Sequence, residues 1–105
     1  MKILKYGMLA LLGAAPLNYA TSCAVIGDAV DGYVTNASSN TYQVTGPVRF
    51  VFASAADIGR PAVTYNANSL IPAGQTARVA HVKLAFTPNP GDTCSFDLGE
   101  NVRKP

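Results

Sequence analysis

Few residues in this chain could take part in catalysis, and they are scattered. Histidine occurs once, at position 81, and Lys83 follows two residues later. A hydroxyl nucleophile needs a general base beside it, and a neighbouring lysine disfavours the charged imidazole without supplying a nucleophile. We therefore interpret His81 as an ordinary surface histidine and predict no catalytic residue. None of the following serines stands in a nucleophile-elbow sequence: Ser38, Ser39, Ser54, Ser69 and Ser95.

The sequence also argues against a metal or cofactor site. A structural zinc site takes four Cys or His ligands, and this chain has one histidine and two cysteines. Asp28 and Asp31 are three residues apart in a strand-like region and should face opposite sides. Neither this pair nor Asp97 with Glu100 resembles the acid and base of a glycosidase. Calcium binding by loop oxygens stays open, although no EF-hand spacing is present.

The two cysteines, Cys23 and Cys94, lie near the two ends of the expected mature domain. In an oxidising compartment an even cysteine count favours a disulfide. On the chain-entropy model, a bridge that closes so long a loop is worth roughly 4 kcal/mol. The alternative is that Cys23 is the lipid-modified first residue of a bacterial lipoprotein. The preceding Ala20-Thr21-Ser22 has the small residues of such a site but lacks its usual leucine, so we favour the bridge.

The first twenty residues have the layout of a secretory signal peptide. A basic start precedes an apolar run from Met8 to Pro16, and small residues follow. The run is too short to cross a bilayer comfortably. We predict a signal peptide over residues 1–20, one domain over residues 21–105 and a secreted or periplasmic location. A cut after Ser22 is the alternative.

Removal of the leader changes the charge balance. The whole chain has a formal net charge of +2, and both basic residues of the leader, Lys2 and Lys5, are lost with it. The mature domain is therefore near neutral, and we predict neither nucleic-acid binding nor a membrane span in it. The basic residues that remain include scattered single positions: Arg49, Arg60, Arg78 and Lys83.

The stretch from Tyr42 to Ser54 has the alternation of a strand with one buried face. Gly46-Pro47 interrupts it, and proline cannot donate to a sheet ladder. A bulge or an edge position is implied, and a kink there would let one strand serve two sheets. The expected buried residues are Tyr42, Val44, Val48, Phe50 and Phe52, and the expected polar ones are Gln43, Thr45 and Arg49.

Further strand-like segments alternate with turn signals and show no helical periodicity. Segment 78–87 should bury Ala80, Val82, Leu84 and Phe86 and place Val79, His81, Lys83 and Thr87 on a mostly polar face. A turn is expected at 70–76, and the tail 99–105 should fray. The remaining strand segments are 25–27, 30–36, 62–67 and 93–98. Together they predict an all-β fold, a small antiparallel sandwich of about six to seven strands.

Several short motifs occur in an order similar to that of a known family. They are Val30-x-Gly32-x-Val34-x-Asn36, Tyr42-x-Val44, Val48-x-Phe50-x-Phe52, Asp57-Ile58-Gly59 and Leu70-x-Pro72-x-Gly74-Gln75-Thr76. Over residues 30–86 this order resembles the FxLYD-type Ig-like domains of exported bacterial proteins. The chain has Ala53-Ser54 in place of the family's Tyr-Asp, and the cysteine pair is not part of the family pattern. The resemblance implies an Ig-like sandwich on the cell surface or in the periplasm and carries over no catalytic residue.

The expected function is that of an exported, non-enzymatic Ig-like module that binds an unknown protein or glycan. The alternatives are a structural subunit that assembles by strand addition and a lipid-anchored envelope lipoprotein. A small hydrolase is disfavoured because histidine occurs once. The oligomeric state stays open. Candidates for the outward faces are Tyr33, Val51, Tyr65 and Val79, and Asn36-Ala37-Ser38 matches a glycosylation sequon that has meaning in a eukaryotic source.

Overall fold

The computed structural model describes residues 17–53 and 61–105, and all regular structure in these ranges is β. No helix that could span a membrane is found there. The prediction of an all-β, antiparallel fold is confirmed, and the loop expected at 53–59 lies outside the described residues apart from Ala53. The strands are β1 (Tyr19–Ile26), β2 (Ala29–Asn36), β3 (Tyr42–Ala53), β4 (Val63–Ile71), β5 (Thr76–Lys83), β6 (Thr93–Asp97) and β7 (Val102–Arg103).

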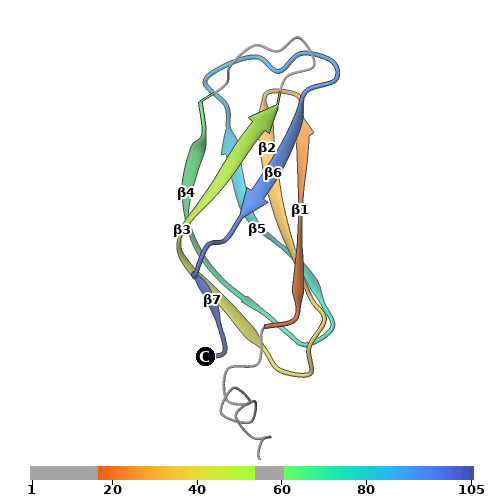
Figure 1. The fold of residues 1–105 in the computed structure, drawn as a ribbon, viewed down its shortest axis with the longest axis vertical. Coiled ribbons are helices and arrows are strands. Elements are labelled where there is room, and N and C mark those ends of the chain that lie inside the picture. Colours follow the sequence, from red (N-terminus) through yellow and green to blue (C-terminus); the bar gives the residue numbers. More distant parts are fainter. Residues whose placement is uncertain (1–16, 54–60) are drawn as a thin grey trace, which may run out of the picture.

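These strands form two antiparallel sheets (Figure 1). Sheet A has the order β1-β2-β5, and sheet B has the order β4-β3-β6, with β7 also pairing with β3. Both sheets contribute to one buried apolar cluster. Phe50 of β3 is fully buried there, and its ring stacks on Phe96 of β6 with the centroids 4.7 Å apart.

The alternation predicted for β3 is confirmed. Tyr42, Val44, Val48 and Phe50 are buried, whereas the intervening residues are half-buried or exposed. Phe52 is half-buried near the end of the strand, and its ring meets that of Phe86 edge-on at 5.3 Å. One face of β3 therefore supplies much of the shared core.

Pro47 lies in the central strand of sheet B, so the expectation of an edge position, or of a strand that serves two sheets, is wrong. The β3–β4 register continues through Pro47, which lies opposite Asn66. On the other side of β3, Asn101 fills the gap between β6 and β7. Its carbonyl accepts the Thr45 N–H at 2.9 Å, and its Nδ2 donates to the Pro47 carbonyl at 2.5 Å. A Cβ at Gly46, where φ is +115°, would lie 2.6 Å from the Asn101 Oδ1, so glycine is required there.

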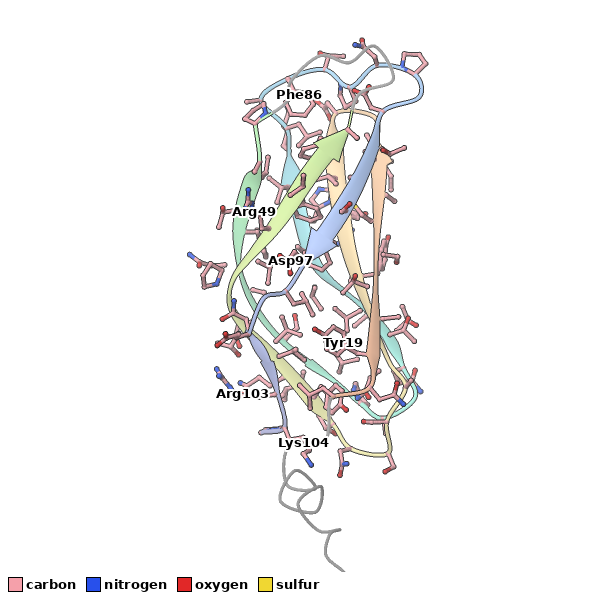
Figure 2. All side chains as sticks on the ribbon, viewed as in Figure 1. Tyr19, Arg49, Phe86, Asp97, Arg103 and Lys104 are labelled. Carbon is pink, nitrogen blue, oxygen red and sulfur yellow. A yellow bond between two sulfur atoms is a disulfide. The ribbon has the colours of Figure 1, made fainter. Side chains whose placement is uncertain are left out.

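Two strands at the ends of the chain differ from the expectation. β1 begins at Tyr19, so the predicted cut after Ala20 falls inside this strand, and the Tyr19 side chain packs against the core (Figure 2). The expectation that the tail frays is wrong for β7, because Val102 is only 7% exposed and belongs to the core cluster. The domain therefore uses residues at both ends that lack a strong strand pattern.

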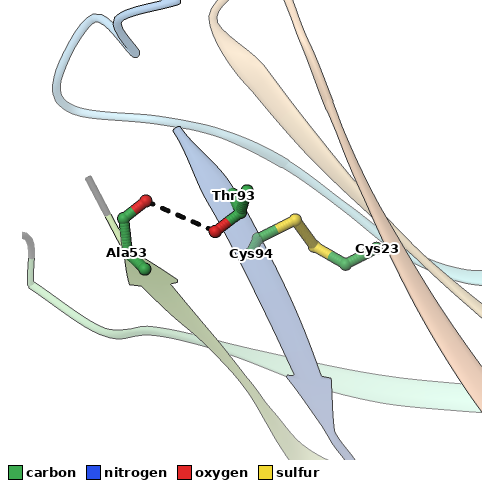
Figure 3. The surroundings of a disulfide bond; sticks show 4 residues. All are labelled: Cys23, Ala53, Thr93 and Cys94. Atoms are coloured by element: carbon green, nitrogen blue, oxygen red, sulfur yellow. Dashed lines mark hydrogen bonds between the residues drawn. A yellow bond between two sulfur atoms is a disulfide. The ribbon is translucent and has the colours of Figure 1, made fainter. Parts of the chain in front are cut away.

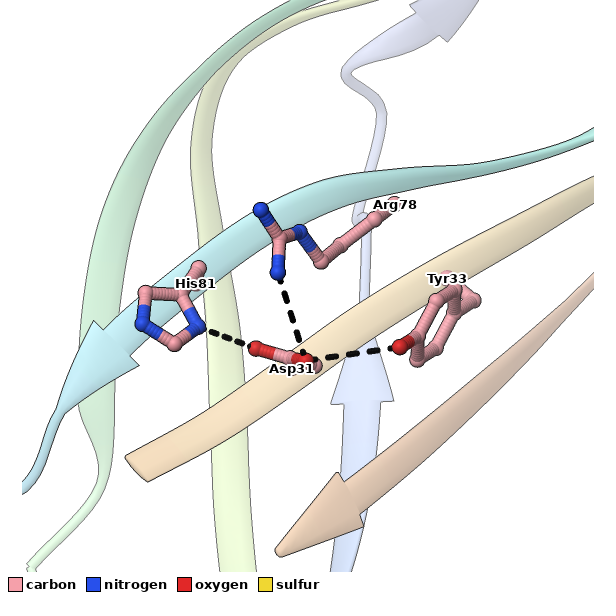
Figure 4. A network of polar contacts seen from close by, with 4 residues as sticks. All are labelled: Asp31, Tyr33, Arg78 and His81. Carbon is pink, nitrogen blue, oxygen red and sulfur yellow. Dashed lines mark hydrogen bonds and ion pairs between the residues drawn. The ribbon is translucent and has the colours of Figure 1, made fainter. Parts of the chain in front are cut away.

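A bulge in β5 corrects the predicted faces of that strand. The register between β2 and β5 shifts so that Val79 has no opposite residue. As a result Val79 and Ala80 are both buried, and the prediction that Val79 lies on the polar face is wrong. Because the bulge resets the alternation, Arg78 and His81 lie on the same, outer face of sheet A (Figure 4). The strand also ends at Lys83.

Gly32 of β2 allows the Phe96 ring to approach the backbone closely. A Cβ at Gly32 would lie 2.7 Å from three carbon atoms of that ring. We expect Gly32→Ala to lower the free energy of unfolding by about 1–3 kcal/mol, because the core would be overpacked. Urea denaturation measures the loss. Phe96→Leu in the Gly32→Ala background should recover part of it, and an unchanged Gly32→Ala variant would contradict the contact.

Candidate functional site

A buried carboxylate organises the outer face of sheet A. Asp31 of β2 is 4% exposed, although its neighbour Val30 points into the core on the other side of the strand. The Tyr33 Oη donates to the Asp31 Oδ2 at 3.3 Å, and an Arg78 nitrogen lies 3.6 Å from the same oxygen. The His81 Nδ1 shares a hydrogen bond with the Asp31 Oδ1. Figure 4 shows these side chains converging from β2 and β5.

The surroundings of Asp31 hold its carboxyl group in the charged form. Burial raises the pKa of this carboxyl, but the hydrogen bond and charge of His81 outweigh it, helped by the Arg78 charge and the Tyr33 hydrogen bond. The net result is a pKa below the ordinary value of 3.8. Asp31 is therefore an anion that fixes its neighbours, while about half of each Arg78 and His81 side chain stays exposed.

The lowered pKa of Asp31 links folding stability to acid pH. Because the folded pKa lies below the unfolded one, the stabilisation is present above pH 3.8 and is lost as the pH falls through the folded pKa. We expect Asp31→Asn to lower the free energy of unfolding at pH 7 by about 1 kcal/mol and to reduce its slope against pH below pH 3.8. Denaturation across this pH range measures both, with Asp28→Asn as the control. Parallel curves for Asp31→Asn and the native chain would contradict the network.

The Asp31–His81 pair has the geometry that orients an imidazole in hydrolases. Within residues 17–53 and 61–105, however, no hydrogen bond joins His81 to a hydroxyl or thiol group. The described part of the chain also has no cavity beside the pair and no group of acidic, His or Cys side chains that could hold a metal. What the arrangement offers is a set of fixed hydrogen-bond donors on an open surface.

Sequence reasoning found His81 at the surface but missed its partner. As expected, Asp28 and Asp31 do not form a pair. The Asp28 Oδ2 instead lies 3.7 Å from the Lys83 Nζ. The available signal was Asp31 itself, the one charged residue of its strand, between Val30 and Gly32. The bulge in β5 decides that Arg78 and His81 lie beside Asp31, and no local sequence pattern predicts this bulge.

The disulfide joins the two sheets. Cys23 of β1 is bonded to Cys94 of β6, with the Cα atoms 5.9 Å apart (Figure 3). Beside it, the Thr93 Oγ1 donates to the Ala53 carbonyl at 3.5 Å. The bridge predicted from the cysteine count is present, and it occupies the sulfur atom that a lipid anchor on Cys23 would need.

The sequon at Asn36 is buried in the folded chain. Asn36 is 0% exposed, and its Nδ2 donates to the carbonyls of Asn40 at 2.7 Å and Ile71 at 2.8 Å. Its Oδ1 accepts hydrogen bonds from the Ser38 N–H and Oγ. Asn36 thus closes the turn after β2, and its amide nitrogen is not accessible for glycan attachment in the folded domain.

The outer surfaces also carry single apolar side chains. Val51 and Tyr65 are exposed, as predicted. Tyr33 lies on the outer face, also as predicted, but is half-buried against Asp31, and Val79 is buried.

The large exposed apolar residues are Ile26 of β1, Val51 of β3, and Tyr65 and Leu70, which lie five residues apart on β4. The Asp31 network is the best-defined candidate site because its side chains contact one another. Comparisons of this chain with protein-family models, with curated proteins and with solved structures found no match.

Proposed function

We propose that the chain is an exported, non-enzymatic Ig-like module that binds a protein or glycan at the cell envelope. Two antiparallel sheets that share one core and are joined by a disulfide support an Ig-like sandwich. The disulfide favours an oxidising compartment outside the cytosol. The motif order that resembles FxLYD-type domains agrees with both inferences.

One observation carries the binding proposal: Arg78 and His81 are half-exposed yet anchored to a buried carboxylate. Side chains that are already fixed lose less conformational entropy when a partner binds. The surface around them is open, since the described residues form no cavity there. This arrangement suits a flat partner surface that supplies hydrogen-bond acceptors or negative charge.

The test uses purified mature protein and envelope fragments of the source organism. The fraction of protein that sediments with the fragments is measured for the native chain and for His81→Ala and Arg78→Ala. We expect about tenfold weaker binding for each variant, because each loses a charged or hydrogen-bonding contact of more than 1 kcal/mol. Arg103→Ala, which changes an exposed arginine on sheet B, is the matched control and should bind like the native chain.

Treatment of the fragments separates the two partner classes. Protease should abolish binding to a protein, whereas periodate oxidation should abolish binding to a glycan. Circular dichroism shows whether each variant keeps its fold. Equal sedimentation of His81→Ala, Arg78→Ala and Arg103→Ala would contradict the proposed site, and no sedimentation of the native chain would contradict envelope binding.

A second candidate function is assembly by strand addition at an open sheet edge. The observation that favours it is the composition of β1. This terminal strand of sheet A has no charged residue and no proline over its eight residues.

A further inference from the structure

The four edges of the two sheets differ in how well they are protected against pairing with another strand. β5 has a bulge and carries Arg78 and Lys83, and the edge formed by β6 and β7 is interrupted at Asn101 and carries Asp97 and Arg103 (Figure 2). Such bulges, breaks and charges discourage edge pairing. β1 has none of them, because its register with β2 is unbroken from end to end.

β4 is the other uncharged terminal strand. It contains Asn66 and Asn68, and asparagine is depleted in paired strands. β1 instead places Ala20, Ser22 and Ala24 on the outer face of sheet A, where small side chains leave room for a neighbouring strand. Of the two uncharged edges, β1 is therefore the better template.

The ladder shows which backbone groups β1 leaves unpaired among the described residues. On β2, the Asn36 N–H donates to Gln75 and its carbonyl accepts from Gly74, so both groups point away from β1. Tyr19 lies opposite Asn36 and therefore makes no ladder bonds with it. Because bonding alternates along an antiparallel pair, the outward N–H and C=O groups of β1 belong to these residues: Tyr19, Thr21, Cys23 and Val25.

We propose that β1 pairs in antiparallel fashion with β1 of a second copy of this chain, about a two-fold axis at Ser22. In this register Tyr19 lies opposite Val25, and Thr21 lies opposite Cys23. All outward N–H and C=O groups of β1 then find partners, and the two copies form one continuous sheet. Because a two-fold axis uses the same edge of both copies, no free β1 edge is left for a third copy, and the contact gives a dimer rather than a fibre.

The side chains fit the same register. On the outer face, Ser22 meets Ser22 and Ala20 meets Ala24, so no like charges are opposed. Ile26, which is 57% exposed, lies opposite Asn18 of the other copy and loses part of its exposure to water. A chain cut after Ala20 keeps the outward groups of Thr21, Cys23 and Val25 and pairs with the axis moved to Cys23.

The experiment is analytical ultracentrifugation of the purified native chain over a concentration series, without envelope material. We expect a concentration-dependent species of twice the monomer mass. Ser22→Lys should weaken association at least tenfold, because the two lysines would lie directly opposite each other with the axis at Ser22 and would be diagonal neighbours with the axis at Cys23. Ser22→Glu should do the same, and an equimolar mixture of the two variants should recover the dimer. Misfolded variants would not recover it.

Asn66→Lys places the same charge on β4 and is the matched control that should leave the dimer intact. A monomer at every concentration up to about 1 mM would overturn the proposal. Loss of the dimer in Asn66→Lys but not in Ser22→Lys would also overturn it and assign the edge to β4. The inference rests on the second candidate function, and its failure would leave the envelope-binding result untouched because His81 and Arg78 play no part in this assay.

Discussion

Loss of the Cys23–Cys94 disulfide is expected to lower the free energy of unfolding by about 4 kcal/mol. The bond closes a loop with a sequence separation of 71 residues, and opening it gives the unfolded chain much more conformational freedom. It also joins β1 of sheet A to β6 of sheet B, so its loss removes a covalent link across the shared core. A typical small domain has about 5–15 kcal/mol in all, and the reduced protein should therefore unfold at a much lower urea concentration.

The measurement compares urea denaturation of the native protein, with and without reductant, with the variant in which Cys23 and Cys94 are both serine. The double variant should resemble the reduced native protein and should not respond to reductant. Mass spectrometry of unreduced peptides should show Cys23 joined to Cys94. A native protein whose free energy of unfolding is the same with and without reductant would contradict the bridge, as would a diacylglycerol adduct on Cys23.

Phe50→Ala should have the second large effect, a loss of about 3–5 kcal/mol. Phe50 is 0% exposed, and its ring stacks on Phe96, so alanine would leave a cavity where β3 and β6 meet. The adjacent Val51→Ala should change stability by less than about 0.5 kcal/mol, because Val51 is 43% exposed on the other face of the same strand. Urea denaturation of both variants measures the difference.

Phe50→Leu is the control for shape, because leucine fills more of the cavity, and its loss should be smaller than that of Phe50→Ala. A variant Val51→Ala that loses as much stability as Phe50→Ala would contradict the alternation of β3. It would mean that both faces of this strand contribute equally to the core.

Strong local patterns were enough to predict the main strands. The alternation around Phe50 identified β3, the turn at Pro72 and Gly74 separated β4 from β5, and the cysteine count identified the disulfide. The alternation and the turn depend on residues close in sequence, and two cysteines can form only one intramolecular disulfide. β1 was predicted too short because its small residues, such as Ala20 and Thr21, also suit the end of a leader.

The candidate site depends on long-range register, which local patterns do not contain. The bulge at Val79 decides that Arg78 and His81 share a face, and it forms only where β5 meets β2. Pro47 is similar. Its nitrogen faces the interruption between β6 and β7, where no paired strand needs an N–H donor, and Asn101, far along the chain, bonds to its carbonyl on that side. In both cases contacts between residues far apart in the sequence decide a feature that the local sequence pattern does not predict.

The support that Asn101 gives to β3 also sets the order of events during biosynthesis. The partners of β3 on this side come from β6 and β7, which are made long after β3 itself. A nascent chain that has β1 to β5 outside the ribosome still lacks Cys94, Phe96 and Asn101, so sheet B cannot close co-translationally until those residues emerge.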